Sequence, residues 1–192
     1  APTIYEVNVG FDGYVLPNPN LRPELVQNLE LLCEHRFSET MHGVLSVYTS
    51  RLINVIEQTN LGGGVLQFKN TLSAGSYGAS AEVNGRLENG MHWYGSYGYV
   101  NVRDLKNDQW LTNSPHHLLK AGVAIPLPAS LRLAPEIYAQ TARRTVYDTE
   151  TRPFVIGNVN LTFAPRFSGR AAWLSRFQLG LKVRNILNTD YR

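Results

Sequence analysis

The residues of this chain best suited to metal binding are five histidines and one cysteine. His116 and His117 are adjacent, and neighbouring side chains on a strand point to opposite faces, so these two cannot readily bind one ion. The other three are His35, His42 and His92. None of them shows ligand spacing with a cysteine or a carboxylate cluster. Cys33 is the only cysteine, which excludes an internal disulfide and a zinc site built from several cysteines, and we expect it to lie inertly on an apolar face.

Catalytic motifs are also missing from the sequence. It contains no G-x-S-x-G nucleophile elbow and no paired-carboxylate motif. The glycines at 62–64 lack the Lys-Ser/Thr pair of a phosphate loop, so they predict a turn. The "NLT" at 160–162 fits a glycosylation sequon but falls inside a predicted strand, where we interpret it as a chance match. We therefore predict no enzyme, no catalytic residue, no cofactor and no metal site.

The charge distribution excludes a nucleic-acid-binding surface. The formal net charge is +3, from 18 basic and 15 acidic residues that are interleaved along the chain rather than clustered. No apolar run approaches the roughly 20 residues of a membrane-spanning helix, and the N-terminus lacks the regions of a signal peptide. These features exclude a helical membrane protein but not a barrel, because the alternating strands of a transmembrane barrel average to a hydropathy near zero.

The dominant pattern has a period of two, which predicts antiparallel strands with one apolar and one polar face. In residues 29–37 the odd positions are Leu29, Leu31, Cys33, His35 and Phe37, and the even positions include Glu30, Glu34 and Arg36. The same alternation recurs in residues 77–88, 119–125, 131–140, 155–163 and 177–183, and two less regular segments, 44–56 and 91–103, are rich in β-branched and aromatic residues. We count about eight strands, mostly about 9 to 14 residues long, and a tilted strand needs about 9 to 11 residues to cross a bilayer.

The connections alternate in length along the chain. Short ones occur at "SET" (38–40), "ENG" (88–90) and "PLPAS" (126–130), and longer ones at "QTNLGGG" (58–64), "DLKNDQWLTNS" (104–114) and "ARRTVYDTETRP" (142–153). Residues 164–174 form a moderately long exception on the short side. Outer-membrane barrels have short periplasmic turns and long outer loops, whereas a soluble sandwich has no reason to separate loop lengths in this way. Aromatic residues near the predicted strand ends fit the girdles of such barrels, although strands of any protein favour aromatics.

Several motifs resemble the TonB-dependent receptors of Gram-negative outer membranes. They are "AP" with "IYE" at the start, "NPNLRPE" (18–24) with Asn28 and Glu30 after it, "SYGASAE" (76–82), "NSPHHLLKAGVAIPL" (113–127) and "VRNILNTDYR" (183–192). They occur in the family's order over nearly the whole chain. The resemblance implies an all-β, antiparallel, up-and-down transmembrane β-barrel, of which residues 1–192 would be a C-terminal part: about eight strands forming an open sheet, without the plug domain and the final strand.

The resemblance also implies a function and partners. We expect an outer-membrane receptor for energised uptake of a scarce nutrient, such as a ferric siderophore, cobalamin or another metal complex. Its partners would be outer-membrane lipid, the plug and the remaining barrel strands, with TonB acting through a plug segment that this chain lacks. We expect "NPNLRPE" to set the entry angle of the next strand through its prolines and through turn-capping Asn18 and Asn20.

Two groups of residues are candidates for function. The polar positions on the predicted strands would face the barrel lumen, where they either line the substrate's route and contact the plug or simply form the wet face of the sheet; they are Glu30, Glu34, Arg36, Glu82, Arg86, Arg132, Glu136, Arg176, Lys182 and Arg184. The second group lies in the predicted outer loops and comprises Trp110, Arg143, Arg144 and Tyr147. Arginines and aromatics can hold an anionic chelate by charge-assisted hydrogen bonds and stacking, although outer loops also carry charge for solubility alone.

Two alternatives stay open at this stage. Eight strands suffice for a small closed outer-membrane barrel with a structural or adhesion role, which requires the first strand to pair with the eighth. A soluble β-barrel carrier would instead turn its apolar faces inward around a ligand.

Overall fold

The computed structural model describes residues 2–3, 6–7 and 14–191, apart from the side chains of Arg170 and Ala171. Ile4 and Tyr5, which belong to the opening motif of the resemblance, lie outside the described residues. In the part of the chain that is described, no helix combines the length and the apolar character needed to span a membrane.

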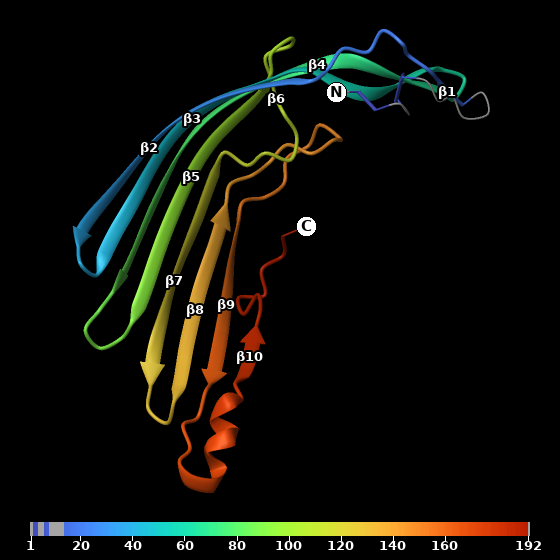
Figure 1. Cartoon of the computed structure of the whole chain (residues 1–192). Helices are drawn as coiled ribbons and strands as arrows, with labels where there is room; N and C mark the ends of the chain where they lie inside the picture. The colour runs from blue at the N-terminus through green and yellow to red at the C-terminus, as the bar shows by residue number, and fades with distance from the viewer. Residues whose placement is uncertain (1, 4–5, 8–13, 192) are drawn as a thin grey trace. The chain divides into compact units, whose positions relative to one another are not determined.

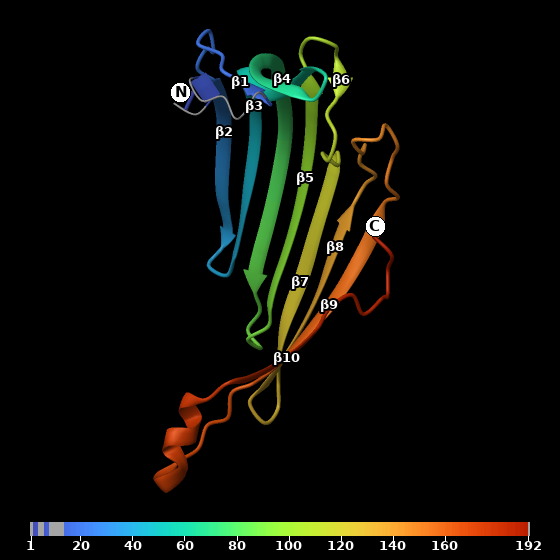
Figure 2. The same cartoon turned by 90° about the vertical axis from the view of Figure 1, so that its right-hand side faces the viewer.

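The structure is an antiparallel sheet whose strands follow one another in the order β10-β9-β8-β7-β5-β4-β3-β2, and much of this order can be followed in Figures 1 and 2. The bounds are β2 Leu25–Ser38, β3 Met41–Gly62, β4 Val65–Arg86, β5 His92–Asp104, β7 His117–Leu127, β8 Leu131–Gln140, β9 Phe154–Phe163 and β10 Leu179–Val183. Two short strands lie off this path: β1 (Val15–Leu16) pairs in parallel with β4, and β6 (Gln109–Trp110) pairs with β5. The path ends at β10 and β2, which do not pair with each other, so the small closed barrel of the first alternative does not form from the described residues.

The strand register separates an apolar face from a polar face, as the alternation predicted. Leu131 pairs with Phe163 and Phe163 with Leu179, so these three side chains form one row across β8, β9 and β10. A second row joins the leucines at 133, 161 and 181. Since successive residues of a strand alternate in direction, the intervening Arg132, Glu136 and Lys182 fall on the opposite face.

The apolar face is exposed rather than packed into a core. Leu29 and Leu31 of β2 are 72% and 71% exposed, and Leu179 and Leu181 of β10 are 67% and 63% exposed. Among the described residues, Ala74 is the only buried hydrophobic residue. A sheet this apolar on one side needs a non-aqueous surrounding, which is what lipid provides for a barrel wall.

Two aromatic side chains of the apolar face cover glycines near the short connections. A Cβ at Gly85 would lie 2.8 Å from the Trp93 ring, and a Cβ at Gly43 would lie 3.0 Å from the Phe37 ring. The glycines therefore leave the space that the rings occupy, an arrangement that fixes ring position on a sheet surface.

The chain divides into two compact units, each described here by itself. Residues 31–47, 78–100 and 112–192 form the larger unit, which contains β7 to β10 and parts of β2 to β5. Residues 1–30, 48–77 and 101–111 form the other unit, built on the remaining parts of β2 to β5 with β1 and β6.

In this second unit the "NPNLRPE" segment docks on β3 and β4. Asn18 Oδ1 accepts a hydrogen bond from the backbone N–H of Asn20 at 3.1 Å, and its Nδ2 donates to the carbonyl of Phe68 at 2.8 Å. Glu24 Oε1 accepts from the backbone N–H of Ile56 at 2.8 Å. These contacts agree with the expected structural role at the entry to β2.

Four sequence expectations about the elements were wrong. β3 and β4 each have 22 residues instead of about 9 to 14, so "QTNLGGG" is not a long loop but the end of β3 followed by a turn at Gly63 and Gly64. These two glycines have positive φ angles of 61° and 83°, which a tight turn requires. The last strand begins at Leu179 instead of residue 177. Residues 164–178 contain a 3-10 helix, Gly169–Arg176, which no periodicity predicted.

Candidate functional site: the polar face of the larger unit

The centre of the polar face is a row of four residues from four strands. The register pairs Tyr94 of β5 with Gly122 of β7, and Gly122 with Glu136 of β8. Glu136 in turn pairs with Asn158 of β9. The four residues therefore lie side by side on one face, although 64 positions separate Tyr94 from Asn158 in the sequence.

Three side chains converge on the Glu136 carboxylate. Asn158 Nδ2 donates a hydrogen bond to Oε1 at 3.1 Å, and Lys182 Nζ lies 3.4 Å from the same oxygen. The Tyr94 side chain also interacts with Glu136 across Gly122. Asn158 extends the network, because its Oδ1 accepts from the backbone N–H of Asn185 at 2.9 Å and so ties the residues after β10 to β9.

Gly122 makes the contact between Tyr94 and Glu136 possible. A Cβ at Gly122 would lie 2.6 to 2.9 Å from the outer atoms of the Tyr94 ring. The ring therefore lies across the glycine on β7 and reaches the next strand but one, a contact that a larger residue at 122 would obstruct.

The Glu136 network borders a cavity of about 590 Å³, lined by Arg36, His42, Asn84, Arg86, Tyr94 and Glu136 among others. His42 Nε2 and Asn84 Nδ2 are 3.2 Å apart, so these two side chains are paired within the wall. The guanidinium groups of Arg36 and Arg86 are exposed and offer donors for carboxylate, phosphate or carbonyl oxygens. The arrangement can therefore bind a polar partner through these donors and the Glu136 carboxylate.

The structure distributes the ten polar residues of the sequence analysis over several places. Arg36, Arg86 and Glu136 meet at the cavity, and Lys182 joins them through Glu136. The remaining six do not converge: Glu34, Glu82 and Arg132 lie on β2, β4 and β8, Arg184 follows β10, Arg176 ends the 3-10 helix, and Glu30 belongs to the other unit.

The β8–β9 connection brings three of the four loop candidates into one folded turn. The backbone N–H of Thr151 donates to the Arg143 carbonyl at 2.9 Å, and Arg144 Nε donates to Asp148 Oδ1 at 2.7 Å. Tyr147, at the tip, is 85% exposed. The Arg143 side chain has no ion pair among the described residues, so of the two arginines it is the better placed to bind an anion.

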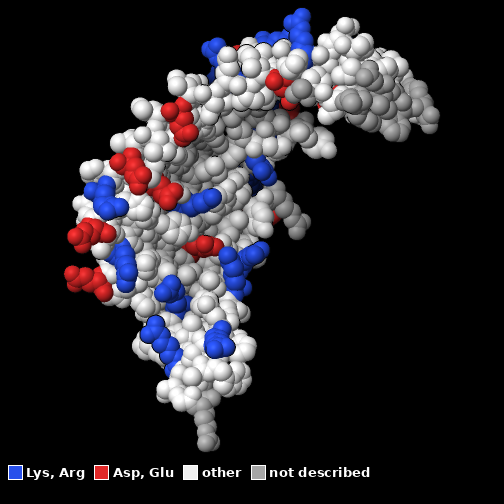
Figure 3. Space-filling view, in the orientation of Figure 1, with Lys and Arg blue, Asp and Glu red and all other residues white. Residues whose placement is uncertain are grey.

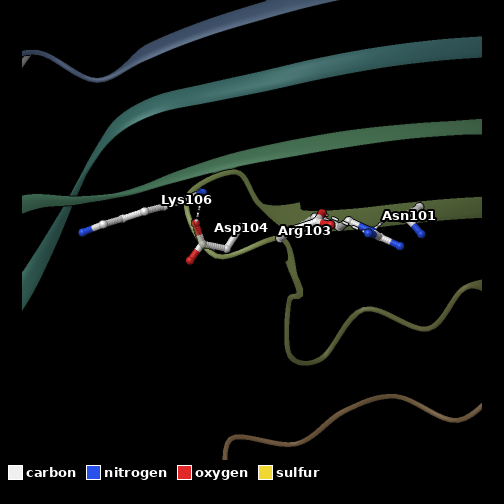
Figure 4. A network of polar contacts seen from close by, with 5 residues as sticks. Asn101, Arg103, Asp104 and Lys106 are labelled. Carbon is white, nitrogen blue, oxygen red and sulfur yellow. Dashed lines mark hydrogen bonds and ion pairs between the residues drawn. The ribbon is translucent and has the colours of Figure 1, made fainter.

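Trp110, the fourth loop candidate, belongs to the other unit, where β6 pairs it with Arg103 of β5. Figure 4 shows the polar network at this end of β5. The buried Asp104 accepts hydrogen bonds from the backbone N–H of Lys106 at 2.8 Å and from Asn107 Nδ2 at 2.7 Å, while Arg103 forms an ion pair with Asp108 at 2.9 Å. The network closes the turn after β5 and so fixes the strand that carries Trp110.

Sequence reasoning missed Tyr94, Gly122 and Asn158 as members of the site. Their positions on the even face of predicted strands were a signal, but only the register between strands shows that they meet at Glu136. Asn185 contributes through its backbone, which no side-chain pattern could show.

The sequence from residue 1 to residue 186 matches the family described as TonB dependent receptor-like, beta-barrel. No curated protein sequence matches the chain. Among solved structures, the copper transporter OprC resembles it with a TM-score of 0.70 at 14% identity, over 91% of this chain and 27% of that one. The ferric citrate transporter FecA gives a TM-score of 0.70 at 18% identity, over 90% of this chain and 28% of that one.

The FrpB iron transporter of Neisseria meningitidis gives a TM-score of 0.70 at 12% identity, over 93% of this chain and 28% of that one. These identities establish a shared fold, and the chain spans about a quarter of the length of each neighbour. Family members act as receptors and transporters in the outer membrane of Gram-negative bacteria. The match over nearly all of its residues, together with the open antiparallel sheet, shows that this chain belongs to the TonB-dependent receptor β-barrel family and is an outer-membrane protein.

Proposed function

We propose that residues 1–192 form a C-terminal part of the barrel wall of a receptor that imports a scarce nutrient, such as a ferric siderophore, cobalamin or another metal complex. The polar face lines the lumen in this proposal, and the long connections lie at the cell surface. The plug domain and the other strands belong to the rest of the receptor, and TonB acts on the plug from the periplasm.

The observation that carries the proposal is the separation of two faces by the register. The face with Leu131, Phe163 and Leu179 is apolar, and Leu179 on it is 67% exposed, as a lipid-facing side chain is, while the opposite face carries Glu136 and Lys182. Transmembrane barrels with a wet lumen have this arrangement. Neighbours of the same fold are named as transporters of copper, iron and ferric citrate, which favours a metal complex as the cargo.

The β8–β9 connection supports a role in first contact with the cargo. Arg143 and Tyr147 offer a cation and an exposed ring in one ordered turn, and the Arg144–Asp148 ion pair holds that turn. An anionic ferric chelate would accept charge-assisted hydrogen bonds from Arg143 and stack on Tyr147.

The first test is uptake by the full-length receptor in cells. Transport of radiolabelled ferric citrate, a panel of ferric siderophores, cobalamin and Cu²⁺ would be compared between cells with the receptor, cells without it, and cells without TonB. We expect one of these compounds to enter only when both receptor and TonB are present. If the uptake that requires the receptor is unchanged in cells without TonB, energised import is contradicted.

The second test concerns the loop. Replacing Arg143 by Ala in the full-length receptor should weaken binding of the transported compound about ten-fold or more, as expected for the loss of a hydrogen bond to a charged group. Replacing Arg144 should weaken it as well, by releasing the turn. The matched control is R152A, because Arg152 is an exposed arginine of the same connection that lies outside the turn. Equal affinity in R143A and R152A would remove Arg143 from the binding site.

A further inference from the structure

The β9–β10 connection is longer and chemically different from the other connections at its end of the sheet. The β7–β8 connection has only three residues, 128–130, whereas β9 and β10 are separated by residues 164–178. Barrels keep their periplasmic turns short, so the barrel itself does not require this length. We call residues 164–178 the basic segment.

The basic segment is rich in arginine and contains no acidic residue. Its arginines are Arg166, Arg170 and Arg176, and no Asp or Glu occurs anywhere between Glu150 and Asp190. Arg166 and Arg176 are exposed, and neither forms an ion pair with any residue that the structure describes. The segment lies at the bottom of Figure 1. In the same orientation, Figure 3 shows Lys or Arg but no Asp or Glu on the visible surface there.

Three aromatic side chains of the basic segment are also exposed. Phe167, Trp173 and Phe177 are 46%, 57% and 58% exposed, and the rings of Trp173 and Phe177 pack edge to face with their centroids 5.7 Å apart. Exposing three large aromatic rings to water has a cost in free energy that an interfacial environment would remove.

Internal hydrogen bonds hold the segment in an ordered shape. The backbone N–H of Phe167 donates to Ser175 Oγ at 2.6 Å, and the Ser175 hydroxyl donates to the Phe167 carbonyl at 3.2 Å. Ser175 thus holds Phe167 beside the last turn of the 3-10 helix, which carries Trp173 and leads to Phe177. The aromatic and basic side chains are therefore presented together by a built structure.

The segment is also continuous with the lipid-facing surface. It begins directly after Phe163 and ends directly before Leu179, which are paired neighbours in the apolar row with Leu131. A short element that joins this row and combines arginines with Trp and Phe has the composition of an interfacial membrane anchor. Anionic headgroups attract such arginines at the membrane surface.

We propose that the basic segment is an interfacial anchor that binds anionic phospholipid headgroups in the leaflet at the short-turn end of the barrel. Arg166 and Arg176 hold the phosphates, and the three aromatic rings lie at the boundary between headgroups and acyl chains. This function is separate from transport, and it does not depend on which compound the receptor imports.

The test uses the full-length receptor in which Cys33 and any other cysteine are replaced by Ala. The substitution S168C then provides a single cysteine, to which a fluorescent donor is attached on the segment. Ser168 is exposed and its side chain makes no capping hydrogen bond, so the label leaves the fold intact. The receptor is reconstituted in two preparations of phosphatidylcholine vesicles. One contains a small fraction of acyl-chain-labelled phosphatidylglycerol as the energy-transfer acceptor, and the other contains the same fraction of acyl-chain-labelled phosphatidylcholine. We expect clearly greater transfer to phosphatidylglycerol, and we expect high salt to reduce the difference.

The decisive variant is R166Q/R176Q, in which the preference for phosphatidylglycerol should fall by about 25-fold, because each arginine contributes about five-fold. The matched control, K106Q/R152Q, removes the same charge from exposed positions in the long connections and should keep the preference. No preference in the parent protein, an unchanged preference in R166Q/R176Q, or an equal loss in K106Q/R152Q would each overturn the proposal. Equal transfer to both lipids is the result expected if the segment binds a periplasmic protein instead.

Discussion

Gly122 and Tyr94 give the sharpest test of the polar-face geometry. Replacing Gly122 by Ala puts a methyl group 2.6 to 2.9 Å from the outer atoms of the Tyr94 ring, closer than any such contact can be. The ring must swing away, and it then loses its place over β7 and its contact with Glu136. Overpacking of this kind costs about 1 to 3 kcal/mol in the free energy of unfolding. Ala at a strand position also regains about 0.5 to 1 kcal/mol relative to Gly, so we expect a net loss of about 1 to 2 kcal/mol.

The same substitution in a Tyr94→Ala background removes the obstruction. G122A should then be neutral or should raise the free energy of unfolding by up to about 1 kcal/mol, which gives a coupling of about 2 kcal/mol between the two positions. The assay is a double-mutant cycle on the full-length receptor in detergent, with unfolding by guanidinium chloride followed by tryptophan fluorescence. An equal cost of G122A in both backgrounds would refute the contact.

Two further outcomes follow from the charged groups. Lys182→Ala should lower the free energy of unfolding by less than about 1 kcal/mol. The reason is that the Lys182 and Glu136 side chains are 46% and 37% exposed, so water screens their ion pair. A loss above about 2 kcal/mol in the same unfolding assay would contradict this reasoning, because it would require a more deeply buried pair in the intact receptor. Asp104→Ala should cost about 1 to 3 kcal/mol, because Asp104 is buried and accepts hydrogen bonds from the Lys106 backbone and the Asn107 side chain. Asp104→Asn keeps one acceptor oxygen and should lose clearly less than Asp104→Ala, so equal losses would contradict the turn-closing role.

The strands that were predicted well are those with one wet and one apolar face. β2, β8 and β9 alternate because each residue faces either lipid or water, so the period of two can be read from the sequence alone. For the same reason Leu131, Phe163 and Leu179 could be placed on the apolar face from the sequence, although only the register shows that they form one row.

The prediction of strand bounds failed in the parts of the sheet that do not need one apolar and one polar face. β3 and β4 have 22 residues, about twice the number that a crossing needs, so much of each strand is free from the demand for an apolar face. Residues 58–62 accordingly show weak alternation and were assigned to a loop, and residues 65–70 were not included in any predicted strand. β1 and β6 have two residues each and depend on pairing with distant strands, so no local pattern predicts them.

The Glu136 network could not be derived from the sequence, because it depends on how neighbouring strands are aligned. The alternation places Tyr94, Glu136 and Lys182 on the polar face but does not align one strand against the next. Gly122 has no side chain that a face pattern could assign, yet it provides the space in which Tyr94 reaches Glu136.

The exposure of the two faces also bears on what the sheet needs to be stable. A sheet in which Ala74 is the only buried hydrophobic residue among those described gains almost nothing from an internal core. Its apolar side chains can leave water only by contact with lipid, and the free edges of β2 and β10 can satisfy their backbone groups in lipid only by pairing with further strands. A soluble carrier would instead need these apolar side chains to pack around a ligand. The same physical demand fits this sheet as one part of a larger barrel wall, and it supports our proposal that the polar face, with Glu136 at its centre, borders the lumen.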